Sequence, residues 1–276
     1  RLRSLPSLAL LNMKYIDVHC HVQFDPYDAD RDELIARMRG REVGGVVVGV
    51  DYESSKSAIA LAEKHDHLFA SIGLHPNYEG KEWYEVEKYR ELATSKKVVA
   101  VGECGLDYYR PTEVNDEVKR KQKAILNDQI TLAGELDLPL IIHSRPSKGT
   151  QDAYQDLIAI LTEAKQKYPN LRGDIHFFVG CVAEAQALVA LGFALSFTAV
   201  ITFARDYDEV IRTIPLESIL SETDSPYVAP ASRRGERNDP LAVEEVVAKI
   251  AEIRGETIEA VRETLLKNVQ RVFYLI

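Results

Sequence analysis

The sequence predicts a (β/α)8 barrel, the TIM barrel, in which parallel strands form a closed cylinder covered by helices. Short apolar runs bounded by glycine or proline alternate along the chain with longer stretches of helical periodicity, as expected for parallel strands joined by crossover helices. Eight such units fit in the 276 residues, a length typical of this fold. No Gly-x-Gly-x-x-Gly segment follows the first strand, so the competing architecture, an open dinucleotide-binding sheet, lacks its main support.

The predicted strands are short and mostly rich in valine, isoleucine, leucine or phenylalanine, which favour buried strands. Pro76 stops the third strand and Pro226 the eighth, because proline cannot donate to a strand ladder. In chain order, the strands are expected at residues 15–21, 45–50, 68–74, 98–103, 140–145, 173–178, 193–197 and 219–224.

The predicted helices place apolar residues on one side and charges on the other, the pattern of a helix that covers a sheet. Gly40 ends the first helix, and Pro169 stops the helix before the sixth strand. In order, the helices are expected at residues 31–40, 51–64, 82–93, 116–136, 153–167, 183–191, 207–214, 241–253 and 257–273.

Residues 13–276 are predicted to form a single domain, because no low-complexity segment or interdomain linker interrupts them. Residues 1–12 contain one apolar patch that is too short for a secretion signal or a membrane span. We interpret these residues as an N-terminal extension that need not be native, with Met13 as the candidate first residue.

Composition and charge indicate a soluble enzyme. Hydrophobic residues make up 46% of the chain and charged residues 28%, the balance of a globular protein. No segment approaches the roughly 18 apolar residues of a membrane span, so we expect no membrane partner, a cytoplasmic location and, as the favoured state, a monomer. The net charge of −9 argues against coating nucleic acid through the overall field, but it allows a local basic pocket for a phosphate-bearing substrate.

The cysteines Cys20, Cys104 and Cys181 show no Cys-x-x-Cys spacing. This pattern argues against both a disulfide framework and a thiolate zinc site. Cys20 and Cys104 alternate with residues expected to face inward, so they should face the covering helices as small buried side chains.

Metal-ligating side chains stand at the ends of otherwise apolar strands. His19 and His21 point to the same face of the first strand, because side chains alternate along a strand. The C-terminal ends of barrel strands meet at the face that holds the active site, so ligands from different strands should surround one opening. The other four candidates end the fourth, fifth, sixth and eighth strands: Glu103, His143, His176 and Asp224.

Imidazole and carboxylate ligands together suit zinc and other divalent metals. Six such groups, with one carboxylate able to bridge, are enough for two ions rather than one. A two-metal site can activate water and polarise the scissile group, which suits hydrolysis of phosphate esters, carboxylic esters, lactones or amides. The ligand set alone does not choose among these substrates.

Several segments, in a fixed order between Met13 and Ile276, carry a family pattern: Asp17–His21, Gly73–Pro76, Val101–Tyr109, Leu138–Arg145, Glu222–Tyr227, Arg234–Pro240 and the closing Asn268-x-x-Arg271-x-Phe273. Together they resemble the TatD family of metal-dependent deoxyribonucleases. Two positions depart from the family pattern. The usual His-Cys-Phe-Ser-Gly is replaced by a segment with Val179 in place of the serine, and Pro146 stands where the family often has an acidic residue.

The resemblance implies a barrel of the amidohydrolase superfamily, of the metallo-dependent hydrolase type, with two divalent ions such as Zn²⁺, Mg²⁺ or Mn²⁺. One ion would be held by His19, His21, Glu103 and Asp224, and the other by Glu103, His143 and His176, with Glu103 bridging. Asp224 would also accept a proton from the attacking water, so Asp224 and Glu103 are the predicted catalytic residues. The implied activity is hydrolysis of DNA phosphodiester bonds, commonly as a 3′-to-5′ exonuclease that prefers single strands, with DNA as the partner.

Two predicted substrate contacts lie at strand ends. His75 ends the third strand and could contact a phosphate or a leaving group, although it could also simply support the rim beside Pro76. Arg145 shares the face of His143 and could neutralise a phosphate oxygen, a role that guanidinium fills well, although a structural salt bridge is the alternative.

Two further contacts are predicted in loops. Tyr108, in the loop after the fourth strand with Asp107 and Tyr109, could stack on a nucleobase or could simply pack. Arg234 belongs to a dense basic cluster, Arg233, Arg234 and Arg237, whose position after Asp224 suggests a contact to the phosphate backbone.

Glu222 is expected to point inward beneath Asp224 and to orient a metal ligand. His65 and His67 repeat the spacing of His19 and His21, but they precede the third strand and lie away from the predicted opening. We therefore predict that His65 and His67 are surface residues.

Two alternatives stay open at this point. An esterase or lactonase of the amidohydrolase type would use the same metals on a small substrate. A non-catalytic metal-binding scaffold would keep the barrel without turnover, and the presence of all six candidate ligands argues against it.

Overall fold

The computed structural model describes residues 13–78, 83–110 and 114–274. In this part of the chain, eight strands form one sheet in sequence order, and every neighbouring pair is parallel. The strands are β1 (Tyr15–Cys20), β2 (Val43–Val48), β3 (Leu68–Ile72), β4 (Val98–Asp107), β5 (Leu140–Arg145), β6 (Gly173–His176), β7 (Phe193–Phe197) and β8 (Ile219–Ser221). The prediction for residues 1–12 lies outside the described residues.

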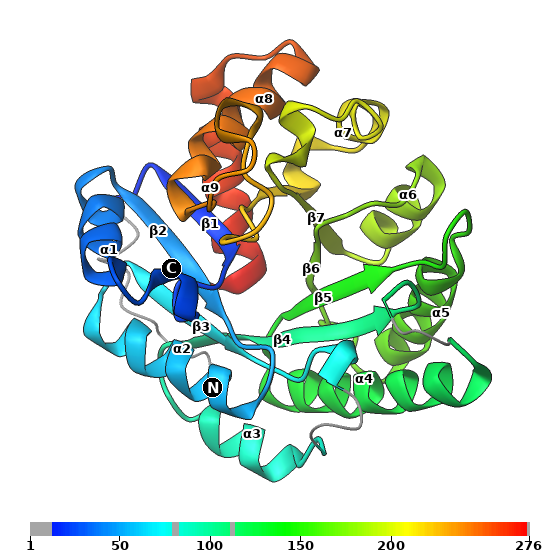
Figure 1. Ribbon diagram of the computed structural model, residues 1–276. Coiled ribbons are helices and arrows are strands. Elements are labelled where there is room, and N and C mark those ends of the chain that lie inside the picture. Colours follow the sequence, from blue (N-terminus) through cyan, green and yellow to red (C-terminus); the bar gives the residue numbers. More distant parts are fainter. Residues whose placement is uncertain (1–12, 79–82, 111–113, 275–276) are drawn as a thin grey trace.

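The helices lie outside the ring of strands (Figure 1). They are α1 (Arg31–Gly40), α2 (Tyr52–Lys64), α3 (Val86–Leu92), α4 (Asp116–Leu136), α5 (Asp152–Lys167), α6 (Val182–Ala190), α7 (Asp208–Thr213), α8 (Val243–Arg254) and α9 (Ile258–Phe273). Among the described residues, no helix is long and apolar enough to cross a membrane.

Side-chain caps set the start of several helices. Asp51 accepts a hydrogen bond from the Ser54 N–H at 2.7 Å, and the Ser54 hydroxyl accepts one from the Asp51 N–H, so the two residues form a capping box at α2. Asn115 caps α4 by accepting from the Val118 N–H at 3.0 Å. These caps satisfy backbone donors that the first turn of a helix leaves free.

The last strand joins the first and closes the sheet. The His19 carbonyl accepts a hydrogen bond from the Asp224 N–H at 2.9 Å, and the His21 N–H donates to the Ser225 carbonyl at 2.8 Å. Cys20 and Ser225 form a parallel bridge between these bonds. The predicted (β/α)8 fold is therefore confirmed.

Apolar side chains fill the barrel interior, and α9 covers the end at which the strands begin. Val269, Val272 and Phe273 of α9 belong to the same buried cluster as the interior side chains of the strands. Asn268 donates to the carbonyls of Leu216 and Ile219, at the entrance to β8, at 2.8 Å each. With this end covered, the opposite end, where the strands finish, is left for a site.

Two strand boundaries differ from the prediction in ways that matter for the site. Strand β4 continues to Asp107, because Cys104 to Asp107 pair with β5 after a shift of register between Val101 and Cys104. Glu103 therefore lies within a long strand rather than at its end. Strand β8 ends at Ser221. The Glu222 N–H still donates to the Phe197 carbonyl of β7 at 3.2 Å, and Thr223 and Asp224 then bond to β1.

The shifted part of β4 depends on two glycines. Gly102 and Gly105 have φ angles of 149° and 144°, a region that residues with a Cβ rarely adopt. A Cβ at Gly102 would also collide with the Ile141 carbonyl, and one at Gly105 with the His143 carbonyl. The close approach of β4 to β5 therefore requires glycine at both positions.

Candidate metal centre

A cavity of about 1260 Å³ lies at the C-terminal ends of the strands. All the predicted ligands except His19 line this cavity, and His19 is completely buried beside His21. The predicted ligands in the lining are His21, Glu103, His143, His176 and Asp224. The structure therefore brings together side chains from β1, β4, β5, β6 and the segment after β8.

Glu103 is the centre of this group, and its two carboxylate oxygens face different histidines. Oε2 lies 3.5 Å from Nε2 of His19. Oε1 lies 3.2 Å from Nδ1 of His143 and 3.7 Å from Nε2 of His176. A carboxylate in this position can bridge two ions.

His19, His21 and Asp224 surround the first position. The Nε2 atoms of His19 and His21 are 3.2 Å apart, and Oδ1 of Asp224 lies 3.5 Å from Nε2 of His21. Two imidazole nitrogens bound to one tetrahedral zinc at about 2.0–2.1 Å lie about 3.4 Å from each other. The observed separation fits two ligands of one ion.

In three of the histidine rings, the nitrogen that points away from Glu103 is held by a hydrogen bond, and this bond fixes which nitrogen faces the centre. Nδ1 of His21 lies 2.9 Å from the Val48 carbonyl, and Nδ1 of His176 lies 2.6 Å from Oε2 of Glu222. Nε2 of His143 lies 3.1 Å from Oδ2 of Asp107. In each ring the other nitrogen is left to face the centre, as in histidines that bind a metal.

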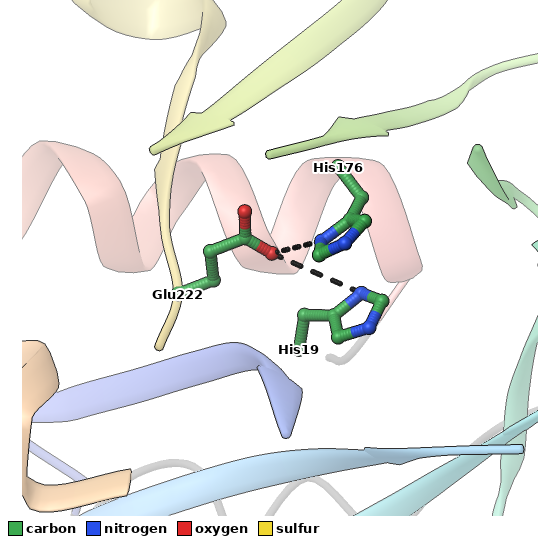
Figure 2. A group of neighbouring side chains, drawn as sticks. All are labelled: His19, His176 and Glu222. Atoms are coloured by element: carbon green, nitrogen blue, oxygen red, sulfur yellow. Dashed lines mark hydrogen bonds and ion pairs between the residues drawn. The ribbon is translucent and has the colours of Figure 1, made fainter. Parts of the chain in front are cut away.

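Glu222 lies behind two of the rings, on the side away from Glu103. Figure 2 shows its carboxylate beside both His19 and His176, whose rings stack with centroids 3.5 Å apart. Oε2 also lies 3.8 Å from Nδ1 of His19, and Oε1 accepts a hydrogen bond from the Phe177 N–H at 2.6 Å. This arrangement agrees with the predicted orienting role of Glu222.

The charges within the group depend on one another. Burial alone would raise the pKa of Glu103, but His75, His143 and His19 hold it well below its usual value. Burial and the neighbouring His176 lower the pKa of His19 to about 4. Burial opposes a charge on His176, yet the surrounding carboxylates, Glu222 above all, raise its pKa to about 10. The carboxylates therefore favour positive charge at this place, and a divalent cation would supply it.

His75 joins this group more closely than the sequence suggested. Its Nε2 lies 3.3 Å from Oε1 of Glu103, and its ring lies 4.6 Å from that of His143, centre to centre. Burial lowers the pKa of His75. His75, Glu103 and His143 thus form a second cluster of nitrogen and oxygen atoms close enough to hold an ion.

Sequence reasoning missed two carboxylates that support the site. Oδ2 of Asp107 contacts both His143 and the Asn77 amide, which donates to it at 2.9 Å. Asp17 is fully buried and accepts hydrogen bonds from the N–H and the hydroxyl of Thr223 at 2.9 and 2.5 Å. Their signal in the sequence is spacing: Asp17 and Asp107 lie two and four residues from predicted ligands on extended strands.

Two of the predicted substrate contacts line the cavity, namely His75 and Arg145, and two do not. Tyr108 is buried, and its hydroxyl donates to Asp156 at 2.9 Å, outside the cavity. The prediction for Tyr108 is therefore wrong, because β4 runs on to Asp107 and the next residue turns toward the helices. Tyr109 lines the cavity in its place.

The basic cluster after β8 also lies outside the cavity lining. The Arg234 guanidinium lies 3.8 Å from the centre of the Phe203 ring on the surface. Arg233 pairs with Asp239, and Arg237 pairs with Asp30 at 2.6 Å. Arg234 therefore does not line the cavity as expected, and its predicted contact to a phosphate backbone stays a prediction.

The prediction that both His65 and His67 are surface residues is wrong for His67, which is only 1% exposed. Its carbonyl accepts a hydrogen bond from the Gly45 N–H at 3.1 Å, which draws the residue into the start of the sheet. Both histidines precede β3 and lie away from the cavity, as predicted.

The family model described as TatD related DNase matches residues 16–274 of the chain. The chain belongs to the TatD family. The uncharacterised metal-dependent hydrolase YabD of Bacillus subtilis is 35% identical over 266 residues, which cover 93% of this chain and 98% of YabD. The TatD members are metal-dependent hydrolases, and the resemblance inferred from the sequence is confirmed.

Two further TatD relatives bear on fold and activity. The protein of Cronobacter sakazakii named 3′-5′ ssDNA/RNA exonuclease TatD is 31% identical over 267 residues, 93% of this chain and 97% of that protein. The crystal structure of YjjV, a TatD homologue from Escherichia coli K12, superposes with a TM-score of 0.84 at 31% identity, over 95% of this chain and 98% of YjjV.

Proposed function

We propose that this TatD member hydrolyses phosphodiester bonds at the 3′ ends of single-stranded nucleic acid, DNA in particular. The observation that carries the proposal is the position of Glu103 at the cavity, with one carboxylate oxygen toward each of two groups of histidines. The exonuclease activity named for the Cronobacter sakazakii relative supports the choice of substrate.

Two divalent ions would be held by residues already near one another. His19, His21, Glu103 and Asp224 would hold one, and Glu103, His143 and His176 the other, with Glu103 shared. The ring nitrogens facing Glu103 and the demand for positive charge at His176 both fit such ions. Zn²⁺, Mg²⁺ and Mn²⁺ are the candidates, and when bound they supply Lewis acidity and lower the pKa of water.

Asp224 is the proposed proton acceptor for the attacking water. It lines the cavity, and its Oδ1 atom faces the Nε2 atoms of His21 and His19. Burial would raise its pKa, but His21, His176 and His19 lower it, so the carboxylate is charged near neutral pH. His75 also lines the cavity beside Glu103, where its ring can contact an oxygen of the scissile phosphate.

The test uses the purified protein, stripped of metal and then loaded separately with Mg²⁺, Mn²⁺ or Zn²⁺. A single-stranded oligodeoxynucleotide labelled at its 5′ end should shorten stepwise from the 3′ end with at least one of these ions. A neutral ester such as p-nitrophenyl acetate serves as the comparison substrate. No shortening with any ion, or turnover of the neutral ester alone, would refute the nuclease and favour the esterase alternative.

A further inference from the structure

Three basic side chains line the cavity from the ends of β4 and β5 and the loops after them: Arg110, Arg145 and Lys148. We call them the cationic arm. Arg145 follows His143 by two residues on β5, and Arg110 lies 3.8 Å from the Asp107 carboxylate that contacts His143. Lys148 belongs to the loop between β5 and α5. The cationic arm therefore adjoins the His143 side of the centre.

The cationic arm is poorly neutralised, which is unusual in this acidic chain. Within the described ranges, neither Arg145 nor Lys148 has a carboxylate partner, and Arg110 shares its acid with His143. Elsewhere basic residues commonly pair with acids, as Lys119 does with Asp152 at 2.8 Å. Unpaired cations at a cavity, in a chain of net charge −9, indicate a place for an anion from outside.

The surrounding structure holds the arm in position before any ligand arrives. Oδ1 of Asp107 accepts hydrogen bonds from the backbone N–H groups of Tyr109 and Arg110, at 2.9 Å each. The Arg145 guanidinium lies 4.3 Å from the centre of the Tyr109 ring. Stacking on a ring leaves the N–H edges of a guanidinium free, and those edges match the oxygens of a phosphate.

The loop that carries Lys148 is also anchored. The Ser147 N–H donates to Oδ1 of Asp152 at 2.9 Å, and the Ser147 hydroxyl lies within hydrogen-bond distance of two acceptors, Oδ2 of Asp152 at 2.9 Å and the Tyr108 carbonyl at 3.2 Å. Ser147 thus ties this loop to the segment that follows β4. The two loops of the cationic arm are held together by the protein itself.

The His21 side of the cavity has a different character. Phe24 stacks on the His21 ring with centroids 4.6 Å apart and planes within 6°, and Tyr227 and Val228 also line this side. At about 1260 Å³, the cavity exceeds the roughly 300–1,000 Å³ of ordinary small-molecule sites. It has room for a scissile phosphate at Glu103 with further nucleotide groups on both sides.

We propose that the cationic arm binds the phosphate next to the scissile one, so that the preferred substrate is a nucleic acid chain with at least two consecutive phosphates. This inference rests on the proposed function. It adds that the same cavity also binds the phosphate next to the one that is cleaved. Phosphate contacts position a nucleic acid without reading its sequence, so the selection is for chain length rather than for base.

The test compares a substrate that has a neighbouring phosphate with two that lack one. The first is a single-stranded oligodeoxynucleotide. The second is the same strand with an uncharged methylphosphonate at the penultimate 3′ linkage, and the third is bis(p-nitrophenyl) phosphate, a lone phosphodiester. The double variant Arg110→Gln/Lys148→Gln removes two charges from the arm. The double variant Arg39→Gln/Arg41→Gln removes two charges near the opposite end of the barrel, where Arg39 pairs with Asp66 and Arg41 with Glu244.

The arm variant should lose about 10- to 100-fold in kcat/KM on the oligonucleotide and depend less steeply on salt. Its turnover of bis(p-nitrophenyl) phosphate should stay within about twofold of the original chain. For the original chain, the methylphosphonate should lower kcat/KM by a similar factor. For the arm variant it should lower kcat/KM much less, because the substitution and the methylphosphonate remove the same contact between the arm and the phosphate.

Three results would overturn the inference: an equal loss on bis(p-nitrophenyl) phosphate, equal sensitivity of both proteins to the methylphosphonate, or the same loss in the Arg39/Arg41 variant. Failure of the proposed function is distinguishable, since the original chain would then shorten neither oligonucleotide with any ion, whatever its turnover of bis(p-nitrophenyl) phosphate.

Discussion

The histidines of this site depend on two ring nitrogens: one would bind an ion, and the other is held by a carboxylate on the far side of the ring. His176 illustrates this, because its Nδ1 atom bonds to Glu222 while its Nε2 atom faces Glu103. His143 has the same arrangement with Asp107 behind it. The carboxylate behind each ring fixes the ring orientation and thereby selects the nitrogen that would meet an ion.

Replacement of Glu222 by glutamine should weaken metal binding without unfolding the chain. Glutamine keeps the shape of the side chain but removes the charge beside the His19 and His176 rings. We expect the affinity for Zn²⁺ or Mn²⁺ to fall about 10- to 100-fold, measured by competition with a chelator. Glu163→Gln, an exposed change on α5, is the matched control and should leave the affinity unchanged. Equal affinity in both variants would show that Glu222 does not support the ligands.

At the scale of elements, the closure between β1 and the segment after β8 carries the site. Asp17 on β1 binds both the N–H and the hydroxyl of Thr223, just before Asp224. The same segment pairs with His19 and His21 through the backbone. Two predicted ligands and the proposed proton acceptor are therefore positioned by a single junction.

Asp17→Ala should destabilise the fold, because it leaves buried donors of Thr223 and His19 without an acceptor. A loss of about 2–3 kcal/mol is expected, which corresponds to a fall in Tm of roughly 4–9 °C for a chain of this size. Asp17→Asn keeps an acceptor oxygen and should lose much less. Thermal unfolding followed by circular dichroism measures both, and equal Tm values for the two variants would contradict this role.

The order of the strands and helices could be predicted from the sequence alone. So could the convergence of the six candidate ligands on one opening. Apolar runs and strand-end histidines are local patterns, and they lead directly to β1, β5 and β6. The path of β4 could not be read in this way, because its extension depends on a register shift and on close contact with β5. The contact between Asp107 and His143 depends on this extension, so it could not be predicted from the sequence. The extension also directs Tyr108 away from the cavity and Tyr109 toward it.

The positions predicted for His67 and Arg234 were also wrong because they depend on contacts that the local sequence does not show. The burial of His67 depends on a bond from its carbonyl to β2, and the position of Arg234 depends on the Phe203 ring. Both are contacts between distant parts of the chain, and local spacing does not reveal them. Strand periodicity located the ligands well because a metal site at strand ends uses that periodicity directly.

On the scale of the whole molecule, the two ends of the barrel have separate tasks. Helix α9 packs apolar side chains against the interior and covers the end where the strands begin. The other end holds the cavity, the histidines and the cationic arm. Within the described residues, Arg145 and Lys148 thus lack a carboxylate partner at this cavity although the net charge of the chain is −9, and the phosphates of the proposed substrate would supply the negative charge.

The metal content of Glu103→Gln, measured beside its nuclease activity, tests the central claim most directly. Both proteins are equilibrated with Mn²⁺ or Zn²⁺, freed of excess ion and analysed by elemental mass spectrometry. The account predicts two ions for the original chain and at least one fewer for Glu103→Gln, because the shared carboxylate is weakened as a ligand. Shortening of the oligonucleotide should fall about 100-fold or more in the same sample. A Glu103→Gln protein that retains two ions and full activity would contradict the account.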